Sequence, residues 1–347
     1  MEVLVISTWK PRKGGIVTHV ENLTKRSRNE FLILTYADRD EKDEADVLRV
    51  PYINLPVLRG ISFALFGFFK ARKEEFDIIH AHYAIPQGFA GALLKKFRKK
   101  PLILTVHGSD LTILGASPLM RPILRWVLRS CDRIIAVSKY MKGMLKEFGV
   151  EEEKIRVIHN GVDIQPSPRG KERRIVFIGA LVKQKGVDVL IRAFKKVKGK
   201  HEDLKLLIVG DGPEREKLET FATKLGLADV EFKGYVEDPN PVFSTQSVLV
   251  LPSRIEGFGI VALEAMARGV PVIASKTGGI VEIVTHEENG LLFEKENHMT
   301  LARSLTEIFM DEKLRDKLVK NGKERVKDFT WKKVVEETED VYGEVAG

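Results

Sequence analysis

Short apolar runs recur along the whole chain, and most of them precede a longer stretch in which apolar positions have helical spacing. The runs are rich in β-branched residues, have the length of a strand, and end at Gly, Pro, Asn or Asp. They are Val3–Ile6, Phe31–Leu34, Ile78–Ile79, Leu102–Val106, Ile134–Val137 and Arg156–Ile158, then Ile175–Ile178, Leu204–Val209, Val230–Phe232, Val248–Leu251 and Pro271–Ala274. Strands that alternate with helices predict parallel sheets covered by helices on both faces.

The densest cluster of Pro, Gly and Ser between two strand signals is Gln165–Gly170, which indicates a domain boundary. A chain of 347 residues also has the length of about two domains. We therefore expect two Rossmann-like, doubly wound α/β domains, residues 1–168 and 169–328, that face each other across a cleft. In such sheets ligands bind beyond the carboxyl ends of the strands, so the chemistry is expected there.

Composition excludes several classes of protein. Apolar residues make up 44% of the chain and charged residues 31%, which is typical of a globular protein with full hydrophobic cores. The single cysteine, Cys131, excludes an intramolecular disulfide and a cysteine-rich metal cluster. The longest apolar stretch, Ile61–Phe69, is about half of what a membrane-spanning helix needs. We expect a cytoplasmic protein, and the scarcity of Asn and Gln beside abundant Lys and Glu hints at a thermophilic source.

The positive charge is concentrated in the first half. The chain carries a net charge of +8, yet residues 1–170 hold 28 basic and 19 acidic residues, whereas residues 171–347 hold 29 and 30. This asymmetry arises either from chance placement of solvated lysines or from an anionic partner: nucleic acid, lipid headgroups or a phosphorylated substrate. The phenylalanine-rich segment 61–70 and the basic cluster 95–100 fit a core helix and a solvated helix end. They equally fit docking on an anionic membrane surface.

The strongest motif is Glu256-Gly-Phe-Gly-Ile-Val-Ala-Leu-Glu264, which follows the run Val248–Leu251. Its two glycines flank a phenylalanine, as expected of a loop whose backbone approaches a ligand. A helix is predicted from about Ile260 to Arg268, and the amides of its first turn form an anion site that needs no metal. The carboxylates of Glu256 and Glu264 are separated by the loop and one helical turn, so they can bind different parts of one extended ligand.

Two glycine-containing turns accompany this motif. Lys183 and Lys185 follow the run Ile175–Ile178 and precede a helix expected from Asp188, where lysines can neutralise a phosphate. The segment 206–214 invites a dinucleotide-binding interpretation, but Arg215 replaces the third glycine of that fingerprint, which argues against a nicotinamide enzyme.

In the first half, Gly14 and Gly15 lie between a strand and a helix, and His107 and Asp110 follow another strand. These positions predict a loop over a sugar or phosphate and a hydrogen-bonding histidine at the carboxyl end of the sheet. A zinc site made by His80, His82, His107 and Asp110 is the less favoured alternative, because nothing in the spacing fixes their mutual distances. The Asp38-Arg-Asp40 motif resembles a metal site but lies in a charged run typical of a solvated loop.

The ordered set of motifs resembles the large retaining glycosyltransferase family typified by bacterial mannosyltransferases and sucrose synthases, family 4 of the glycosyltransferases, with the GT-B fold. The Glu256–Glu264 pair matches its Glu-x7-Glu motif. The other matching segments, in family order, are Gly14-Gly15, His107-Gly-Ser-Asp110, His159-Asn-Gly-Val-Asp163, Lys185-Gly186, Gly210-Asp-Gly-Pro213, Gly278-Gly279, Asn289-Gly-Leu-Leu-Phe293 and Phe329-Thr-Trp331.

The resemblance implies a retaining transferase that uses a nucleotide-diphosphate sugar and needs neither cofactor nor metal. Residues 169–328 would bind the donor, residues 1–168 an acceptor glycan or lipid, and a final helix at about 329–347 would return to the first domain. The implied catalytic residues are His107, beside the transferred sugar, and Glu256, on the donor sugar. The implied donor-binding residues are Gly15, Lys185 on the diphosphate, Gly257, Phe258, Gly259, Ile260 and Glu264 on the ribose. Gly14 and Asp110 are implied to bind the acceptor.

One departure from the family pattern is Ala180, where an arginine is usual, so one diphosphate contact is missing or comes from Lys183. Two alternatives remain beside the transferase: a nucleotide-sugar epimerase with the same fold, and a basic, non-catalytic protein that binds membrane or nucleic acid. With the glycosyltransferase motifs taken into account, the partner expected for the basic first half is an anionic acceptor, or the inner face of the membrane that carries it, and not nucleic acid. The sequence leaves the oligomeric state open.

Overall fold

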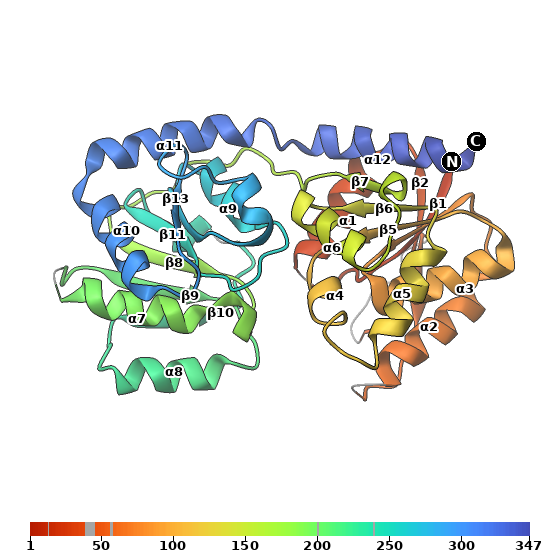
Figure 1. Ribbon diagram of the computed structural model, residues 1–347, viewed down its shortest axis with the longest axis horizontal. Coiled ribbons are helices and arrows are strands. Elements are labelled where there is room, and N and C mark those ends of the chain that lie inside the picture. Colours follow the sequence, from red (N-terminus) through yellow and green to blue (C-terminus); the bar gives the residue numbers. More distant parts are fainter. Residues whose placement is uncertain (13, 39–45, 56–57, 200, 239) are drawn as a thin grey trace. The chain divides into compact units, whose positions relative to one another are not determined.

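The structure of the protein, a computed structural model, describes residues 1–347 except 13, 39–45, 56–57, 200 and 239 (Figure 1). The described residues form two compact units. Unit 1 comprises Met1–Gly161 and Trp331–Gly347, and unit 2 comprises Val162–Thr330. The boundary between the units after Gly161 therefore lies a few residues before the proline-rich segment Gln165–Gly170, where the sequence predicts it.

Unit 1 contains a parallel seven-stranded sheet with the strand order β3-β2-β1-β4-β5-β6-β7. The strands are β1 (Glu2–Ile6), β2 (Glu30–Tyr36), β3 (Val47–Val50), β4 (Ile78–His82), β5 (Leu102–Val106), β6 (Arg133–Ala136) and β7 (Ile155–Val157). The helices are α1 (Gly15–Arg26), α2 (Leu58–Ala71), α3 (Phe89–Arg98), α4 (Ser109–Thr112), α5 (Arg121–Ser130), α6 (Lys139–Glu147) and α12 (Trp331–Ala346). Every residue of β4 and β5 is buried, as expected of central parallel strands.

The last helix of the chain, α12, belongs to unit 1 and packs on α1 (Figure 1). Its Tyr342 side chain is fully buried, and its hydroxyl lies 2.8 Å from Nδ1 of His80 on β4. Through this contact the end of the chain becomes part of the core of unit 1.

Unit 2 contains a parallel six-stranded sheet with the order β10-β9-β8-β11-β12-β13. The strands are β8 (Arg174–Ile178), β9 (Lys205–Val209), β10 (Val230–Gly234), β11 (Ser247–Leu251), β12 (Val272–Ser275) and β13 (Leu291–Phe293). The helices are α7 (Val187–Lys198), α8 (Arg215–Lys224), α9 (Ile260–Ala267), α10 (His298–Met310) and α11 (Glu312–Val326). A continuous core of strand and helix side chains, including Phe177 and Phe194, fills the space between sheet and helices.

These two sheets confirm the predicted fold class. Two strands, β3 and β13, fall outside the apolar runs seen in the sequence. Both lie at the edge of their sheet. The strand β3 is only partly buried and is interrupted by Arg49, and β13 is apolar but only three residues long, so neither forms a run of typical strand length. None of the helices formed by the described residues is long and apolar enough to cross a membrane.

Each sheet has a point at which the strand order reverses. In unit 1, β1 is flanked by β2 and β4, and in unit 2, β8 is flanked by β9 and β11. The loops that leave neighbouring strands at such a point diverge to opposite faces of the sheet and leave a crevice for a ligand. In unit 2, Lys185 and Glu256 follow the strands β8 and β11 at this point. In unit 1, Gly14 and Gly15 follow β1, whereas His107 and Asp110 follow β5, which β4 separates from β1.

Candidate functional site

In unit 2, a lysine and a glutamate meet at the carboxyl ends of β8 and β11. Nζ of Lys185 lies 2.8 Å from Oε2 of Glu256, and the Ser253 hydroxyl donates a hydrogen bond of 2.9 Å to the same oxygen. The Glu256 side chain is 9% exposed, and that of Lys185 29% exposed. The fold therefore brings together two residues that the sequence assigns to the donor, and it holds their opposite charges in a mostly dry position.

Arg254 ties the two loops of this pair together. Its guanidinium donates two hydrogen bonds of 2.9 Å to the carboxylate of Asp188, at the start of α7, and one of 2.7 Å to the carbonyl of Lys183. A second carboxylate, that of Glu296, accepts a hydrogen bond of 2.5 Å from Nε of Arg254. Hydrogen bonding to Asp188 is the main reason why the pKa of Arg254 lies above its usual value. Arg254 belongs to none of the motifs seen in the sequence, because its partners lie far away in the chain.

Close backbone approaches fix the position of Glu256. The amide of Gly279 donates a hydrogen bond of 2.9 Å to the Glu256 carbonyl. A Cβ at Gly278 would lie 1.9 Å from that carbonyl oxygen, and φ is +58° there, so only glycine fits. The Gly278-Gly279 pair thus holds the main chain that carries the glutamate.

The helix predicted after this loop is confirmed as α9, which is eight residues long. Gly259 precedes it with φ 95° and ψ 47°, and a Cβ there would lie 2.6 Å from Cδ1 of Ile280. The first turn of α9 contains no acidic side chain and Gly259 provides no side-chain cap, so its free amides are suited to bind an anion. The Phe258 ring is buried, with its centroid 5.9 Å from that of Phe329, so this residue offers a ligand its backbone and not its ring.

Glu264 lies on α9 one turn beyond its start. Burial raises the pKa of its carboxyl group, and the positive charge of Arg268 opposes that shift. The Arg268 guanidinium nevertheless bonds the backbone carbonyl of Glu264, at 2.8 Å, and the side chain of Asn240, at 2.6 Å. Within the described part of the chain, no group donates a hydrogen bond to the Glu264 carboxylate, which leaves it available to hydroxyl groups of a ligand.

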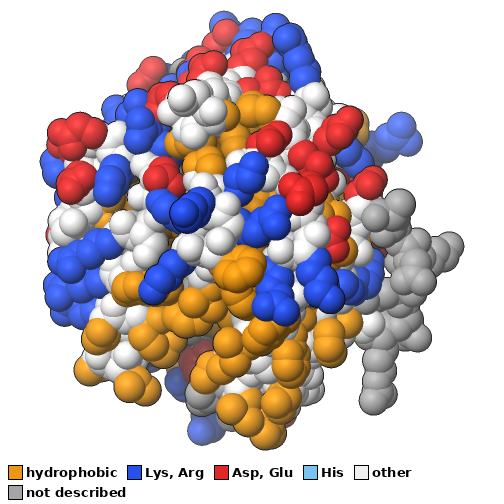
Figure 2. Space-filling model, turned by 90° about the vertical axis from the view of Figure 1, so that its right-hand side faces the viewer, with side chains coloured by type: hydrophobic (Ala, Val, Ile, Leu, Met, Phe, Trp, Pro, Cys, Tyr) orange, Lys and Arg blue, Asp and Glu red, His pale blue; other side chains and the backbone are white. Residues whose placement is uncertain are grey.

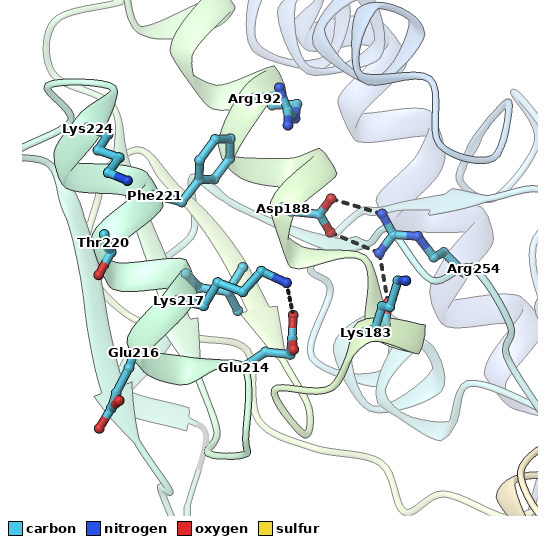
Figure 3. A pocket seen from close by; sticks show the side chains of 11 residues that line it. Lys183, Asp188, Arg192, Glu214, Glu216, Lys217, Thr220, Phe221, Lys224 and Arg254 are labelled. Carbon is cyan, nitrogen blue, oxygen red and sulfur yellow. Dashed lines mark hydrogen bonds and ion pairs between the residues drawn. The ribbon is translucent and has the colours of Figure 1, made fainter.

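Lys183 lines a different part of unit 2. A cavity of 620 Å³ between α7 and α8 is bordered by charged side chains, among them Lys183, Asp188 and Arg254 (Figure 3). The side chain of Lys185, in contrast, pairs with Glu256. That Lys183 replaces the arginine missing at Ala180 stays a prediction.

In unit 1, His107 is part of a cluster of four histidines. Nε2 of His107 lies 3.3 Å from Nδ1 of His82, and the ring of His82 lies 4.2 Å from that of His80. The ring of His19, on α1, lies 5.3 Å from those of His82 and His107. Nδ1 of His19 is 2.7 Å from Oδ1 of Asn160, which fixes the imidazole in place.

Residues from α12 and β5 complete the cluster. The two nitrogens of His80 are each 2.8 Å from a hydroxyl, that of Tyr342 and that of Thr105. The Trp331 ring, at the start of α12, packs edge-on against His19 at 5.7 Å. The position of His107 at this end of the sheet is as expected from the sequence. His19 was not among the expected residues, since one histidine on an amphipathic helix has no distinctive pattern.

Burial lowers the pKa of all four imidazoles, to about 4 for His19, to about 3 for His80, and well below 6.5 for His82 and His107. They are therefore neutral at neutral pH. A neutral imidazole can both donate and accept a hydrogen bond, whereas its cation can only donate. The cluster can hence orient a polar group without adding positive charge.

Asp110 is fully buried on the short helix α4. Its carboxylate accepts hydrogen bonds from the backbone amides of Gly108, at 2.9 Å, and Leu111, at 3.2 Å, with a longer one of 3.4 Å from His107. Burial raises its pKa to about 6 despite these bonds. The carboxylate therefore shapes the loop that carries His107, and its assignment to the acceptor stays a prediction.

Gly14 and Gly15 form the start of α1, after β1. Gly14 has φ 132° and precedes the first turn. Apart from the adjoining residues and the backbone of the helix, no atom of the described residues lies within 4 Å of a Cβ built at either glycine. The loop therefore leaves open space at the amino end of a twelve-residue helix whose buried face carries His19. The roles given to Gly14 and Gly15 remain predictions.

The two metal motifs considered from the sequence have other partners. Asp38 accepts hydrogen bonds of 2.5 and 2.7 Å from Arg12, and Asp40 lies outside the described residues. His80 and His82 bond hydroxyl groups and another imidazole. Among the residues that the structure describes, no group of three or more His, Cys, Asp or Glu is arranged to hold a metal ion.

Comparison with known proteins identifies the family. Residues 163–325 match "Glycosyl transferases group 1", and residues 13–166 match "Glycosyltransferase Family 4". An uncharacterised glycosyltransferase of Methanocaldococcus jannaschii is 42% identical over 100% of this chain and 99% of its own. The N-acetyl-alpha-D-glucosaminyl L-malate synthase of Bacillus anthracis is 30% identical over 79% of this chain and 76% of its own.

Solved structures share the fold. Anabaena HepE, in complex with UDP and glucose, has a TM-score of 0.86 and 21% identity, covering 99% of this chain and 100% of its own. The sucrose-phosphate synthase from Thermosynechococcus elongatus has a TM-score of 0.85 and 23% identity, covering 99% and 98%. The chain belongs to the family of group 1 and family 4 glycosyltransferases, and it is a glycosyltransferase with two Rossmann-like domains of the GT-B type.

Proposed function

We propose that the protein is a retaining, metal-independent glycosyltransferase. It moves a sugar from a nucleotide-diphosphate sugar to an acceptor that is lipid-linked or otherwise anionic. The observation that carries the proposal is the Lys185–Glu256 pair in the loops before α7 and α9. The UDP-glucose complex of Anabaena HepE, a protein of the same fold, supports a nucleotide sugar as the donor.

The main chemical demand is to stabilise the departing nucleoside diphosphate. The Lys185 ammonium provides one positive charge, and the amides near Gly259 provide oriented dipoles at the start of α9. In the free protein, Glu256 neutralises Lys185. The diphosphate of a bound donor competes for that lysine, which frees the Glu256 carboxylate to accept hydrogen bonds from the hydroxyls of the sugar.

The remaining donor contacts follow from the resemblance to the family. Glu264 binds the ribose hydroxyls. Its carboxylate is suited to them because no group of the described residues donates a hydrogen bond to it. The backbone of Gly257, Phe258 and Ile260 contacts sugar and phosphate. In unit 1, Gly15 contacts the donor as well, whereas Gly14 and Asp110 serve the acceptor.

His107 contacts the transferred sugar near the reacting carbon. Its neutral imidazole can orient a sugar hydroxyl without placing a positive charge beside a carbon that becomes electron-poor during transfer. The reaction leaves the anomeric configuration of the sugar unchanged and needs no metal, because the lysine and the amides supply the charge stabilisation.

The basic excess of residues 1–170 supports an acceptor with negative charge, such as a phosphorylated lipid. We place the reaction in the cytoplasm, at the inner face of the membrane, and nucleic acid is not part of it.

The test is a panel of nucleotide sugars incubated with the full chain, with and without acceptors. Transfer or slow hydrolysis of one donor is expected, with unchanged rate in the presence of EDTA. NMR of the product reports the anomeric configuration. An inverted product or loss of activity with EDTA contradicts the respective part of the proposal, and free donor epimers formed without any acceptor indicate an epimerase.

A further inference from the structure

Helix α2 of unit 1 carries apolar residues on two opposite faces. One face is buried in the unit and carries Phe63, Ala64 and Gly67. The opposite face is exposed to solvent and also apolar. Its residues, each 42–52% exposed, are Leu58, Ile61, Leu65, Phe66 and Phe69. A helix with apolar residues on opposite faces normally lies inside a protein or at a membrane, so the outer face needs a partner.

Two neighbouring helices extend this surface. Helix α3 packs on α2, and its Phe97, 56% exposed, has its ring 5.6 Å from that of Phe68. Helix α5 packs on α3 and exposes 41% of Trp126. Figure 2 shows the view onto unit 1, where apolar side chains gather next to Lys and Arg side chains.

The charge of these helices has one sign only. Residues 58–73, 89–100 and 121–130 contain twelve Lys and Arg residues and no Asp or Glu. Some of these cations form ion pairs with carboxylates of other segments, as Lys95 does with Asp132 at 2.6 Å. Lys96, Lys99 and Arg129 form no ion pair within the described part of the chain. The surface is therefore both apolar and strongly cationic.

A basic hollow lies between α3 and α5. It has a volume of 720 Å³ and is lined by Lys95, Lys96, Lys99, Lys100, Trp126 and Arg129. The one carboxylate in its wall, Asp132, bonds Lys95 and the amide of Leu102 at 2.7 Å. An anion of phosphate size would meet several uncompensated positive charges in this hollow.

We infer that α2, α3 and α5 form a docking surface for an anionic lipid bilayer. The exposed side chains of α2 and Phe97 enter the boundary between headgroups and acyl chains, and the basic hollow holds headgroup phosphates. A nucleic acid would neutralise the lysines but leave Phe66 and Phe69 without an apolar partner. A second copy of this chain, docked through the same surface about a two-fold axis, would bring cationic residues against each other.

The proposed docking surface would bring the transferase to a lipid acceptor, and this role rests on the proposed function. Lipid binding itself is measured without sugar transfer, so its test is independent. The experiment is co-sedimentation of the full chain with vesicles of phosphatidylglycerol and phosphatidylcholine in equal parts, and with vesicles of phosphatidylcholine alone. Binding is expected to the first and to be much weaker to the second. Added salt is expected to weaken it, because part of the attraction is electrostatic.

Two double variants divide the contributions. Lys96→Glu with Arg129→Glu removes two cations at the hollow and is expected to weaken binding by about 30-fold or more, at about 1 kcal/mol per charge. Phe66→Ser with Phe69→Ser removes apolar contact and is expected to weaken binding at least about 10-fold. Matched controls in unit 2 are Lys195→Glu with Lys196→Glu, at the end of α7, and Met299→Ser with Met310→Ser, on α10. The controls are expected to bind as the wild type does.

Circular dichroism verifies that each variant is folded, and sedimentation velocity measures its oligomeric state. The inference is overturned if the wild type does not bind anionic vesicles, or if the phenylalanine variant binds as well as the wild type, which indicates a surface for polyanions in general. It is also overturned if the phenylalanine variant dissociates an oligomer. A wild type that binds vesicles but neither binds nor turns over any nucleotide sugar leaves this inference intact and refutes the proposed function.

Discussion

Both units place candidate residues at the carboxyl ends of central parallel strands, but the chemistry of these residues differs. In unit 2 the loops after β8 and β11 carry a charged pair, Lys185 and Glu256, tied together by Arg254. In unit 1 the strands β4 and β5 lead to His82 and His107, whose rings burial keeps uncharged. The fold thus determines where a ligand can bind, and the residues in the loops determine what kind of ligand it is.

The difference has a physical cause. A diphosphate leaving group brings negative charge, and fixed cations and amides can stabilise it. An acceptor hydroxyl and a sugar ring bring no net charge, and a cluster of neutral rings can orient them without a desolvation penalty for buried ions. The comparison predicts that the units respond differently to pH, to charge removal, and to loss of single hydrogen bonds.

The largest expected difference is in stability against acid. Below about pH 6.5 the unfolded chain protonates its histidines, whereas folded unit 1 resists protonation until about pH 4 or lower, so its stability falls with falling pH. Asp110 has the opposite effect on stability, because its pKa of about 6 in the folded unit lies above the pKa of an aspartate in the unfolded chain. Its protonation therefore favours the folded state as the pH falls. Unfolding therefore takes up four protons on the histidines and releases one from Asp110. The free energy of unfolding of unit 1 should change by about 4 kcal/mol per pH unit within this window.

Urea unfolding at several pH values measures this slope. All three tryptophans, Trp9, Trp126 and Trp331, lie in unit 1, so their fluorescence reports on that unit alone. Hydrogen exchange of peptides from β8 to β13 reports on unit 2. An equal acid sensitivity of both units would contradict the assignment of neutral histidines to the native state.

The next largest effect is expected on catalysis in unit 2. Glu256→Gln keeps the size of the side chain but removes the charge opposite Lys185. Because the carboxylate is proposed to hold the sugar through the reaction, kcat should fall by about 100- to 1000-fold. Initial rates at saturating donor measure this change.

Glu264→Gln is the matched control, with the same chemical change on α9. Its proposed contact is with the ribose, away from the reacting carbon. KM for the donor should rise about 10-fold while kcat changes less. A large loss of kcat in Glu264→Gln with little loss in Glu256→Gln would reverse the two roles.

Local sequence pattern accounts for the elements but not for the contacts between them. Parallel strands buried on both faces, such as β5, need unbroken apolar residues, and this need makes them visible in the sequence. Edge strands such as β3 have no such need. Gly259 is visible in the sequence as part of a Gly-Phe-Gly loop expected to approach a ligand closely, and the structure adds that it has a left-handed conformation, which favours glycine.

Tertiary contacts leave no local mark. Lys185 and Glu256 could each be assigned to the donor through their motifs, but their ion pair joins positions far apart in the chain. The same holds for His19, which the sequence analysis missed, and for Tyr342, which reaches His80 across most of the sequence. Such residues become recognisable only when the fold brings their elements together.

A smaller effect is expected from a single hydroxyl group in unit 1. Tyr342→Phe keeps the packing of the ring but leaves Nδ1 of His80 without its partner at 2.8 Å. An unsatisfied buried nitrogen costs about 1–3 kcal/mol, so the free energy of unfolding of unit 1 should fall by that amount. Tryptophan fluorescence during urea unfolding measures it. The control Tyr52→Phe removes a half-buried hydroxyl bonded to Asp38 and should cost less; equal losses would contradict the buried network.

The smallest effect is expected from Arg254, whose hydrogen bonds position the two loops that carry the charged pair of unit 2. Arg254→Lys keeps the positive charge but cannot form the two parallel hydrogen bonds to Asp188 drawn in Figure 3. Because these bonds hold the loop of Lys185 against that of Glu256, KM for the donor should rise about 3- to 10-fold, with about 1 kcal/mol lost from the stability of unit 2. Arg192→Lys, in the same cavity and over the Phe221 ring at 4.7 Å, should leave KM unchanged. A double-mutant cycle with Asp188→Asn isolates the contribution of the Arg254–Asp188 contact. If Arg254→Lys lowers stability but not donor affinity, the arginine stabilises the fold of unit 2 and does not position the charged pair.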